Sequence, residues 1–149
     1  YLADHFPSFP VLPGVLMLEA MVQSAAWLMR VEQEFSRSVI VLSVARNVRY
    51  ASFVQPGRTL RCEVETVSIG PDASKFKGAA YVLDVGDSEG RQAVTARLEL
   101  RSYNLAEREP RMAETDREVI EQLKARFGLV GGPEALKAAG TGSRGVAER

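Results

Sequence analysis

The most informative part of the sequence lies near the N-terminus and reads HFPSFPVLPGVLMLEAMVQSAAWLMR, residues 5–30. Its first part holds prolines at positions 7, 10 and 13, each of which fixes its own φ angle and restricts the residue before it. We therefore expect a stiff, extended loop. From Gly14 to about Phe35 the pattern predicts a single helix with Pro13 at its first position. Because this helix is apolar nearly all round, we expect a sheet to wrap it or a copy of itself to pair with it.

The sequence from Val39 to about Tyr103 predicts β-strands. Residues 94–100 alternate between apolar and polar side chains, as do residues 60–65, which is typical of half-buried strands. Turn signals separate the runs at Pro56-Gly57, at residues 70–72 and at residues 86–90. A long helix followed by an antiparallel meander is an α+β arrangement, and we expect the helix to lie across the concave face of the sheet.

The composition changes after Asn104. Residues 115–118 (Thr-Asp-Arg-Glu) fit a capping box that opens a short helix, and Gly128 is expected to end it. This helix carries one apolar stripe, formed by Val119, Ile120, Leu123 and Phe127. Glycine, alanine and serine dominate from residue 131 onward, which predicts disorder or weak helix. We therefore divide the chain into a domain at 1–103 and a C-terminal extension at 104–149, with one short helix and a disordered tail.

Composition limits the classes of function. A chain of 149 residues, 46% of them hydrophobic, is long enough for one buried core. Nineteen basic residues balance nineteen acidic ones, which argues against a nucleic-acid-binding protein. The single Cys62 cannot form an internal disulfide, and the sequence contains no cluster with zinc-ligand spacing. The most apolar stretch, residues 15–29, is shorter than the roughly 20 residues of a membrane span. We expect a cytoplasmic protein with no membrane insertion and no structural metal.

Two polar residues stand out in apolar surroundings. His5 lies in the proline-rich loop, and Glu19 lies about one and a half turns inside the helix, where desolvation would favour the neutral acid. A neutral carboxylic acid can protonate a leaving hydroxyl, and an imidazole can remove a proton next to a carbonyl. Gly14 offers a free backbone N–H between them. The alternatives are a surface histidine and a structural hydrogen bond between Glu19 and Gln23.

Residues 5–23 closely resemble the signature of the 3-hydroxyacyl-acyl-carrier-protein dehydratases, which have the hot dog fold. The His-Phe-Pro start, the Pro-Gly helix opening and the step of fourteen residues from His5 to Glu19 all coincide. The resemblance continues weakly through residues 48–50, 56–57 and 75–80 and covers about residues 1–103. Glutamate at position 19 resembles the FabZ-type elongation dehydratases, because the FabA-type enzymes usually carry aspartate there.

The resemblance implies a site shared between two subunits. His5 and the carboxylic acid Glu19 would be the catalytic residues, His5 facing the Glu19 of the other subunit. Gly14 N–H would hold the thioester carbonyl, the Val11 carbonyl would orient the imidazole, and Val15 would also bind substrate. The implied protein is a homodimer or higher homo-oligomer in which the two long helices pack together and the sheets join.

The implied reaction converts a (3R)-3-hydroxyacyl thioester into a trans-2-enoyl thioester and water, in fatty acid or related acyl-chain synthesis. It needs neither a metal nor a redox cofactor. The implied partner is an acyl carrier protein, whose phosphopantetheine arm would reach from the surface to an apolar tunnel beside the helix.

The sequence departs from the family pattern in three places. Ser8 and Phe9 replace the usual glycine and histidine of the loop, and Ala51 and Ser52 replace two basic residues. Arg46, Arg49, Lys75 and Lys77 remain as candidates for a basic patch, although charges on strands are more often plain solvated faces. The helix and strands that precede the histidine loop in the family have no counterpart here, so we expect either a truncated sequence or an equivalent elsewhere.

Two other functions remain open. A hot dog thioesterase also uses a carboxylate near the helix but activates water. A non-catalytic acyl-binding subunit would keep the tunnel without needing both His5 and Glu19. The acyl chain length, the choice between carrier protein and coenzyme A, and the choice between dimer and hexamer are not fixed by the motif.

Overall fold

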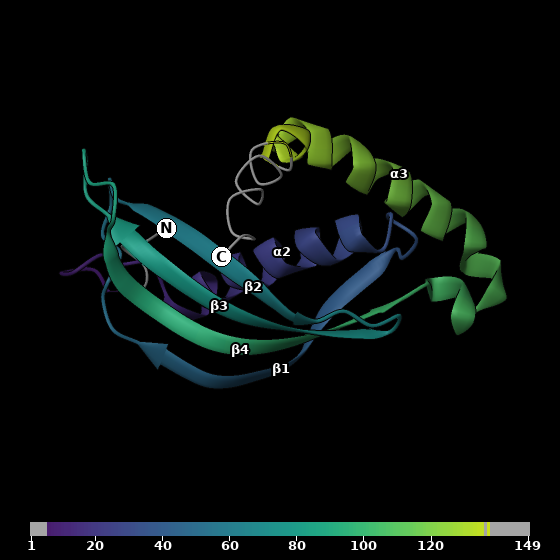
Figure 1. Ribbon diagram of the computed structural model, residues 1–149, viewed down its shortest axis with the longest axis horizontal. Coiled ribbons are helices and arrows are strands. Elements are labelled where there is room, and N and C mark those ends of the chain that lie inside the picture. Colours follow the sequence, from purple (N-terminus) through teal and green to yellow (C-terminus); the bar gives the residue numbers. More distant parts are fainter. Residues whose placement is uncertain (1–5, 136, 138–149) are drawn as a thin grey trace, which may run out of the picture.

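The computed structural model describes residues 6–135 and 137, and its centre is one helix on one curved sheet (Figure 1). Helix α2 spans Gly14–Glu32 and is followed by four strands. The strands are β1 (Val39–Tyr50), β2 (Thr59–Ser68), β3 (Ala73–Leu83) and β4 (Arg91–Tyr103). The sheet curves around α2, so that the helix lies on its concave face, as the sequence predicted.

The strand order is β1-β4-β3-β2, and all neighbouring pairs are antiparallel. The predicted meander is therefore correct only for β2, β3 and β4. β1 pairs with β4 instead of β2, with Ile40 opposite Ser102 and Ala45 opposite Leu98. The connection between β1 and β2 runs past the end of the sheet, where Ala51 N–H donates to the Ala93 carbonyl at 2.8 Å. β1 and β2 consequently form the two edges of the described sheet.

The core lies between α2 and the sheet. The buried face of the helix consists of Met17, Met21, Val22, Ala25, Ala26 and Met29. It packs against buried side chains of β3 and β4, among them Phe76, Val94, Leu98 and Leu100. Helix and sheet approach closely at Gly78, where an added Cβ would lie 3.0 Å from the Met21 sulfur. Larger side chains at position 78 would therefore push α2 off the sheet.

Both ends of α2 differ slightly from the prediction. Pro13 precedes the helix as its N-cap instead of occupying its first position. The helix ends at Glu32, three residues early, because Glu34 and Phe35 adopt left-handed φ angles of 53° and 56°. The Gln33 amide then donates to the Gly70 carbonyl at 3.1 Å and to Ser102 Oγ at 3.1 Å. These bonds hold the end of the helix against the turn between β2 and β3.

The C-terminal part contains 3₁₀ turns η1 (Leu105–Glu107) and η2 (Pro110–Met112) and helix α3 (Ala113–Leu129). The predicted capping box at residues 115–118 is wrong: α3 begins two residues earlier and has no side-chain cap. A capping box is present at η1 instead, where the Glu107 carboxylate accepts a hydrogen bond from the Asn104 N–H at 3.3 Å. The predicted end at Gly128 is one residue short of the observed one. The predicted disordered tail lies largely outside the described residues.

Helix α3 lies on the side of α2 that faces away from the sheet (Figure 1). Its predicted apolar stripe is half-buried. Phe127, the last member of the stripe, contacts Trp27 of α2 and Phe35, with ring centroids 5.6 Å and 5.5 Å apart. Arg30 also lies over the Trp27 ring, with its Cζ 5.3 Å from the ring centroid, and burial lowers the pKa of this guanidinium. Aromatic contacts therefore join α3 to α2 at one end.

A buried carboxylate fixes the other end of α3. Asp116 is 5% exposed and accepts hydrogen bonds from the Ser38 hydroxyl and from the N–H groups of Leu105 and Ala106, the latter two at 2.9 Å. Burial acts to raise the pKa of Asp116, but the bonds from Ser38, Ala106 and Leu105 outweigh it and lower the pKa. Asp116 thereby ties α3 to turn η1 and to the start of β1.

Candidate functional site

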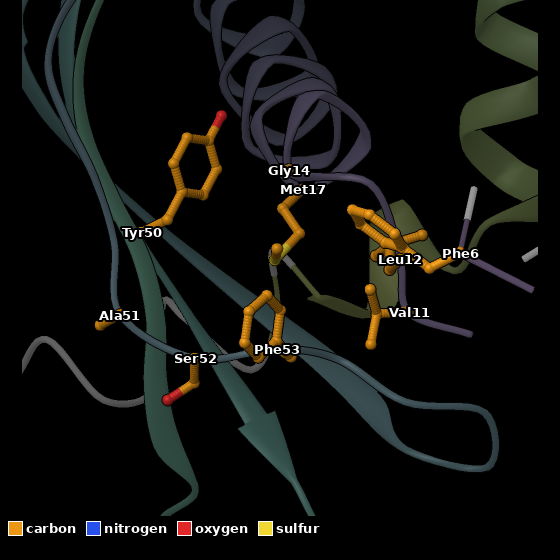
Figure 2. Close-up of a pocket in the computed structure, with 9 residues that line it drawn as sticks. All are labelled: Phe6, Val11, Leu12, Gly14, Met17, Tyr50, Ala51, Ser52 and Phe53. Atoms are coloured by element: carbon orange, nitrogen blue, oxygen red, sulfur yellow. The ribbon is translucent and has the colours of Figure 1, made fainter. Parts of the chain in front are cut away.

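A cavity of about 270 Å³ opens at the N-terminal end of α2 (Figure 2). It lies between the proline-rich loop, the first turn of the helix, and the end of β1 with the segment after it. Nine residues line it: Phe6, Val11, Leu12, Gly14, Met17, Tyr50, Ala51, Ser52 and Phe53. In Figure 2, Tyr50 lies on one side of the cavity and Phe6 and Leu12 on the other. The lining is mostly apolar and suits a hydrocarbon chain.

Gly14 occupies the position at which a side chain would obstruct the cavity. An added Cβ would lie 2.9 Å from the Tyr50 ring. Gly14 N–H is at the first helical position and has no partner within the helix, and the described part of the chain offers it none elsewhere. A free N–H at a helix N-terminus, beside an apolar cavity, can donate a hydrogen bond to a carbonyl oxygen.

Val11 is 2% exposed and is held in place by its neighbours. Leu12 N–H donates to the Val54 carbonyl at 2.8 Å, which ties the loop to the segment after β1. Phe9 and Phe53 make an edge-to-face contact with ring centroids 5.7 Å apart. These contacts fix the loop that precedes α2, and with it the side of the cavity formed by Val11.

Glu19 does not line this cavity and is exposed in the single chain. The burial predicted for its carboxyl is therefore wrong for one protomer. An α-helix turns by about 100° per residue, so that Glu19 projects about 140° away from the direction of Gly14. Gly14 faces the cavity, whereas Glu19 lies on the face of α2 opposite the sheet. Its Oε1 accepts a hydrogen bond from Gln23 Nε2 at 2.6 Å.

The other predicted site residues are placed differently. Val15 is 70% exposed and is not part of the cavity lining, although it follows Gly14 directly. His5 lies outside the described residues. The structure therefore brings Val11 and Gly14 together at one cavity and leaves the predicted catalytic roles of His5 and Glu19 untested.

Sequence reasoning missed several cavity residues, chiefly Met17, Tyr50 and Phe53. Met17 is buried in the core, yet it also lines the cavity and reaches from the helix toward Phe53 (Figure 2). Tyr50 belongs to the weak family match at residues 48–50. It is far in sequence from the motif at residues 5–23, so the sequence did not indicate that its ring lies beside Gly14. Phe53 carried no signal of its own.

Other reactive groups lie away from this cavity. Cys62 is half-buried, and burial raises the pKa of its thiol, which favours the unreactive protonated form. Among residues 6–135 and 137, no group of three or more His, Cys, Asp or Glu side chains could hold a metal ion. Within the same range, no helix is long and apolar enough to cross a membrane.

Comparison with known families identifies the chain. Residues 1–96 match the model of the FabA-like domain. The chain belongs to the FabA-like family. Among its curated relatives is a 3-hydroxyacyl-acyl-carrier-protein dehydratase FabZ of Clostridium kluyveri, 34% identical over 90 residues, which are 60% of this chain and 62% of the relative. The FabZ of Gluconobacter oxydans is 38% identical over 91 residues, 60% of this chain and 54% of the relative.

The predicted resemblance to FabZ-type members of this FabA-like family is thus confirmed. The matched regions span only about half to two thirds of the lengths of these relatives. The activity, substrates and partners named for them are consequently matters for proposal in this chain.

Solved structures confirm the α+β hot dog fold. The dehydratase heterocomplex ApeI:P of Xenorhabdus doucetiae superimposes with a TM-score of 0.55 at 21% identity, over 70% of this FabA-like chain and 68% of that chain. A hexameric hotdog fold thioesterase of Campylobacter jejuni gives a TM-score of 0.51 at 18% identity, over 69% and 77% of the two chains. Similarity at this level of identity establishes the fold alone.

Proposed function

We propose that this FabA-like protein dehydrates 3-hydroxyacyl thioesters to trans-2-enoyl thioesters, in a site built from two copies of the chain. One observation carries the proposal. Within one protomer Gly14 faces an apolar cavity, whereas the carboxylate of Glu19 projects from the opposite face of the same helix. A single chain therefore presents the two groups in divergent directions, and a second copy supplies the missing half of each site.

Apolar side chains exposed on α2 and on the edge strand β1 support pairing with a second copy. Val15 and Leu16 are 70% and 40% exposed on the first turns of α2, and Val41 and Leu42 are 42% and 36% exposed on the edge strand β1. Large exposed apolar side chains around one helix and one sheet edge are typical of an interface between subunits. We infer that this surface forms a homodimer, which would also desolvate Glu19.

The proposed mechanism uses three groups. The thioester carbonyl oxygen accepts a hydrogen bond from Gly14 N–H, which stabilises the charge that develops on that oxygen. The imidazole of His5 removes the proton from Cα, and the Cα–Cβ double bond forms as the bond between Cβ and the hydroxyl breaks. Glu19 of the partner subunit, in its protonated form, donates its proton to the departing hydroxyl, which leaves as water. Solvent then returns the proton held by His5 to the carboxylate.

The acyl chain would occupy the cavity between Tyr50, Met17 and Phe53. The thioester would be delivered by an acyl carrier protein, as the names of the FabZ relatives suggest. We place this reaction in the cytoplasm. None of the steps proposed here uses a metal or redox group.

An assay on the purified full chain tests the proposal. Incubation with a 3-hydroxyacyl thioester is expected to produce the ultraviolet absorbance of a conjugated enoyl thioester without release of free thiol. Release of free thiol without enoyl product would identify a thioesterase. Tight binding of the thioester with neither product would identify a non-catalytic acyl-binding subunit.

A further inference from the structure

Tyr50 brings a phenol hydroxyl to the cavity at the N-terminal end of α2. It is the last residue of β1 and lies opposite Val94 of β4, which is fully buried. Directly paired residues on neighbouring antiparallel strands point to the same face of a sheet, so Tyr50 points to the face that carries α2. Figure 2 shows its side chain extending from the strand toward the first turns of the helix, with the hydroxyl at its tip.

The ring of Tyr50 lies directly against Gly14. A Cβ added to Gly14 would be 2.9 Å from Tyr50 Cε1 and 3.0 Å from Tyr50 Cζ. Because Cζ carries the hydroxyl, the hydroxyl oxygen is one covalent bond away from an atom in contact with this position. The Gly14 N–H and the Tyr50 O–H are hydrogen-bond donors from distant parts of the chain, and the fold brings both to one end of the cavity.

Neither donor is occupied within the part of the chain that the structure describes. Gly14 N–H has no partner there, and the Tyr50 hydroxyl forms no hydrogen bond with a described residue. Tyr50 is 50% exposed, so water can bond to its hydroxyl until a ligand displaces that water. The contact between the ring and Gly14 involves carbon atoms alone and does not require the hydroxyl.

We propose that the Tyr50 hydroxyl donates a second hydrogen bond to the thioester carbonyl oxygen that Gly14 N–H binds, an inference that rests on the proposed dehydratase function. A carbonyl oxygen has two lone pairs and accepts from two donors at once. Charge builds up on this oxygen as Cα loses its proton, so a second donor stabilises the transition state more than the bound substrate. Tyr50 donates only a hydrogen bond and keeps its proton throughout the reaction.

Two other polar groups near Gly14 are less well placed. The Ser52 hydroxyl also lines the cavity, but in Figure 2 its side chain points away from α2. Val15 N–H is also unbonded among the described residues, yet Val15 does not belong to the cavity lining. Tyr50 therefore offers the side chain that can best share one oxygen with Gly14.

The change Tyr50→Phe removes the hydroxyl and keeps the ring. In the dehydratase assay we expect kcat to fall about tenfold or more while KM stays within about twofold, because the hydroxyl acts mainly on the transition state. Tyr81→Phe is the matched control, because Tyr81 lies on β3 outside the cavity lining with its ring beside Arg61. We expect its kcat to stay within about twofold of the original. Both variants are expected to unfold at the temperature of the original protein, since both keep the ring.

A second measurement needs no turnover and separates this inference from the proposed function. Its probe is a saturated hexanoyl thioester, isotope-labelled at the carbonyl carbon, which has no hydroxyl to eliminate. Hydrogen bonds polarise a carbonyl group and lower its infrared stretching frequency. We therefore expect the band of the bound probe to move back toward its solution position in Tyr50→Phe and to stay in place in Tyr81→Phe.

The outcomes of the two measurements are distinguishable. If the original protein dehydrates no thioester, the proposed function fails, while the carbonyl band still tests the contact with Tyr50. Unchanged kcat in Tyr50→Phe would overturn the role of its hydroxyl. An unchanged carbonyl band would overturn it as well, even if kcat fell, because the loss would then come from an altered structure. A probe that does not bind to the original protein would overturn both the role of Tyr50 and the assignment of the cavity.

Discussion

Gln23 and Glu19 form a hydrogen-bonded pair one helical turn apart, with 2.6 Å between Gln23 Nε2 and Glu19 Oε1, on the face of α2 that turns away from the sheet. The bond fixes the position of one carboxylate oxygen and leaves the other free. In the mechanism proposed above, this hydrogen bond would orient Glu19 for proton transfer to a substrate bound by a second subunit.

The change Glu19→Gln removes the proposed acid while keeping the size of the side chain. We expect dehydration to fall by a factor of about 100 or more, because general acid catalysis contributes on this scale. Glu19 is exposed in the protomer, so the unfolding temperature is expected to change little. Initial rates and thermal unfolding, measured on the same preparation, test both points. Rates within about twofold of the original would exclude Glu19 as the acid.

The change Gln23→Ala removes only the orienting hydrogen bond. We expect a smaller loss of activity, about tenfold, expressed mainly in kcat, because the acid remains present but is less well positioned. Ser24→Ala, on the adjacent residue, is the control, because the Ser24 hydroxyl donates to the Ala20 carbonyl within the helix and has no other hydrogen bond among the described residues. Equal effects of the two changes would show that Gln23 has no specific role in orienting Glu19.

The change Gly14→Ala tests the cavity. The new Cβ would lie within 2.9 Å of the Tyr50 ring, so the ring must move into the space that we assign to the acyl chain. Alanine suits a helix better than glycine by about 1 kcal/mol, so stability is expected to hold or rise while activity falls. Steady-state kinetics together with thermal unfolding separate the two effects. Full activity combined with an unchanged KM would place the substrate elsewhere.

The lowered pKa of Asp116 is expected to make the stability of the folded protein depend on pH. Its pKa is lower in the folded protein than in the unfolded chain, so its contribution is complete above the unfolded pKa of about 3.9 and disappears as pH falls through the folded value. We expect Asp116→Asn to lower the unfolding temperature at pH 7 and to have a progressively smaller effect below about pH 4. Unfolding curves across this range measure the difference between the two proteins. A difference that stays constant with pH would show that the charge of Asp116 contributes nothing.

We expect the aromatic contact between Phe127 and Trp27 to stabilise the packing of α3 against α2. Truncation by Phe127→Ala is expected to cost about 1–3 kcal/mol of unfolding free energy, because it removes two ring contacts. Leu129→Ala changes a residue of the same helix that is 87% exposed, and its cost is expected to stay within about 0.5 kcal/mol. Denaturant titrations of both variants provide the comparison. Equal costs would mean that α3 does not depend on the aromatic cluster.

Local pattern predicted the elements of this fold better than their arrangement. The long helix and the strands follow from the periodicity of residues 14–32 and 39–103. The pairing of β1 with β4 does not, because alternation shows which face of a strand is buried and not which strand lies beside it. The start of α3 was misplaced because Thr115 and Glu118 fit a capping motif, whereas the helix already begins at Ala113.

In the candidate site, too, the sequence predicted local features better than the arrangement of distant residues. The motif predicted Val11 and Gly14 at one place, and both line the cavity. The burial of Glu19 was inferred from apolar neighbours in sequence, but a helix that is apolar all round does not reveal which of its faces meets the sheet. Tyr50 and Phe53 lie at and just after the end of β1, and only the folding of the sheet around α2 brings them to the cavity. No pattern near residue 14 could therefore indicate them.

A subunit-mixing experiment with two variants that are each expected to be inactive, His5→Ala and Glu19→Gln, tests whether two chains share each site. If each site combines His5 of one chain with Glu19 of the other, a mixed dimer regains one intact site, and random mixing in equal amounts restores about a quarter of the original activity. Each variant alone stays inactive. A mixture that shows subunit exchange by mass spectrometry but no recovery of dehydration would contradict a site shared between two copies of the chain.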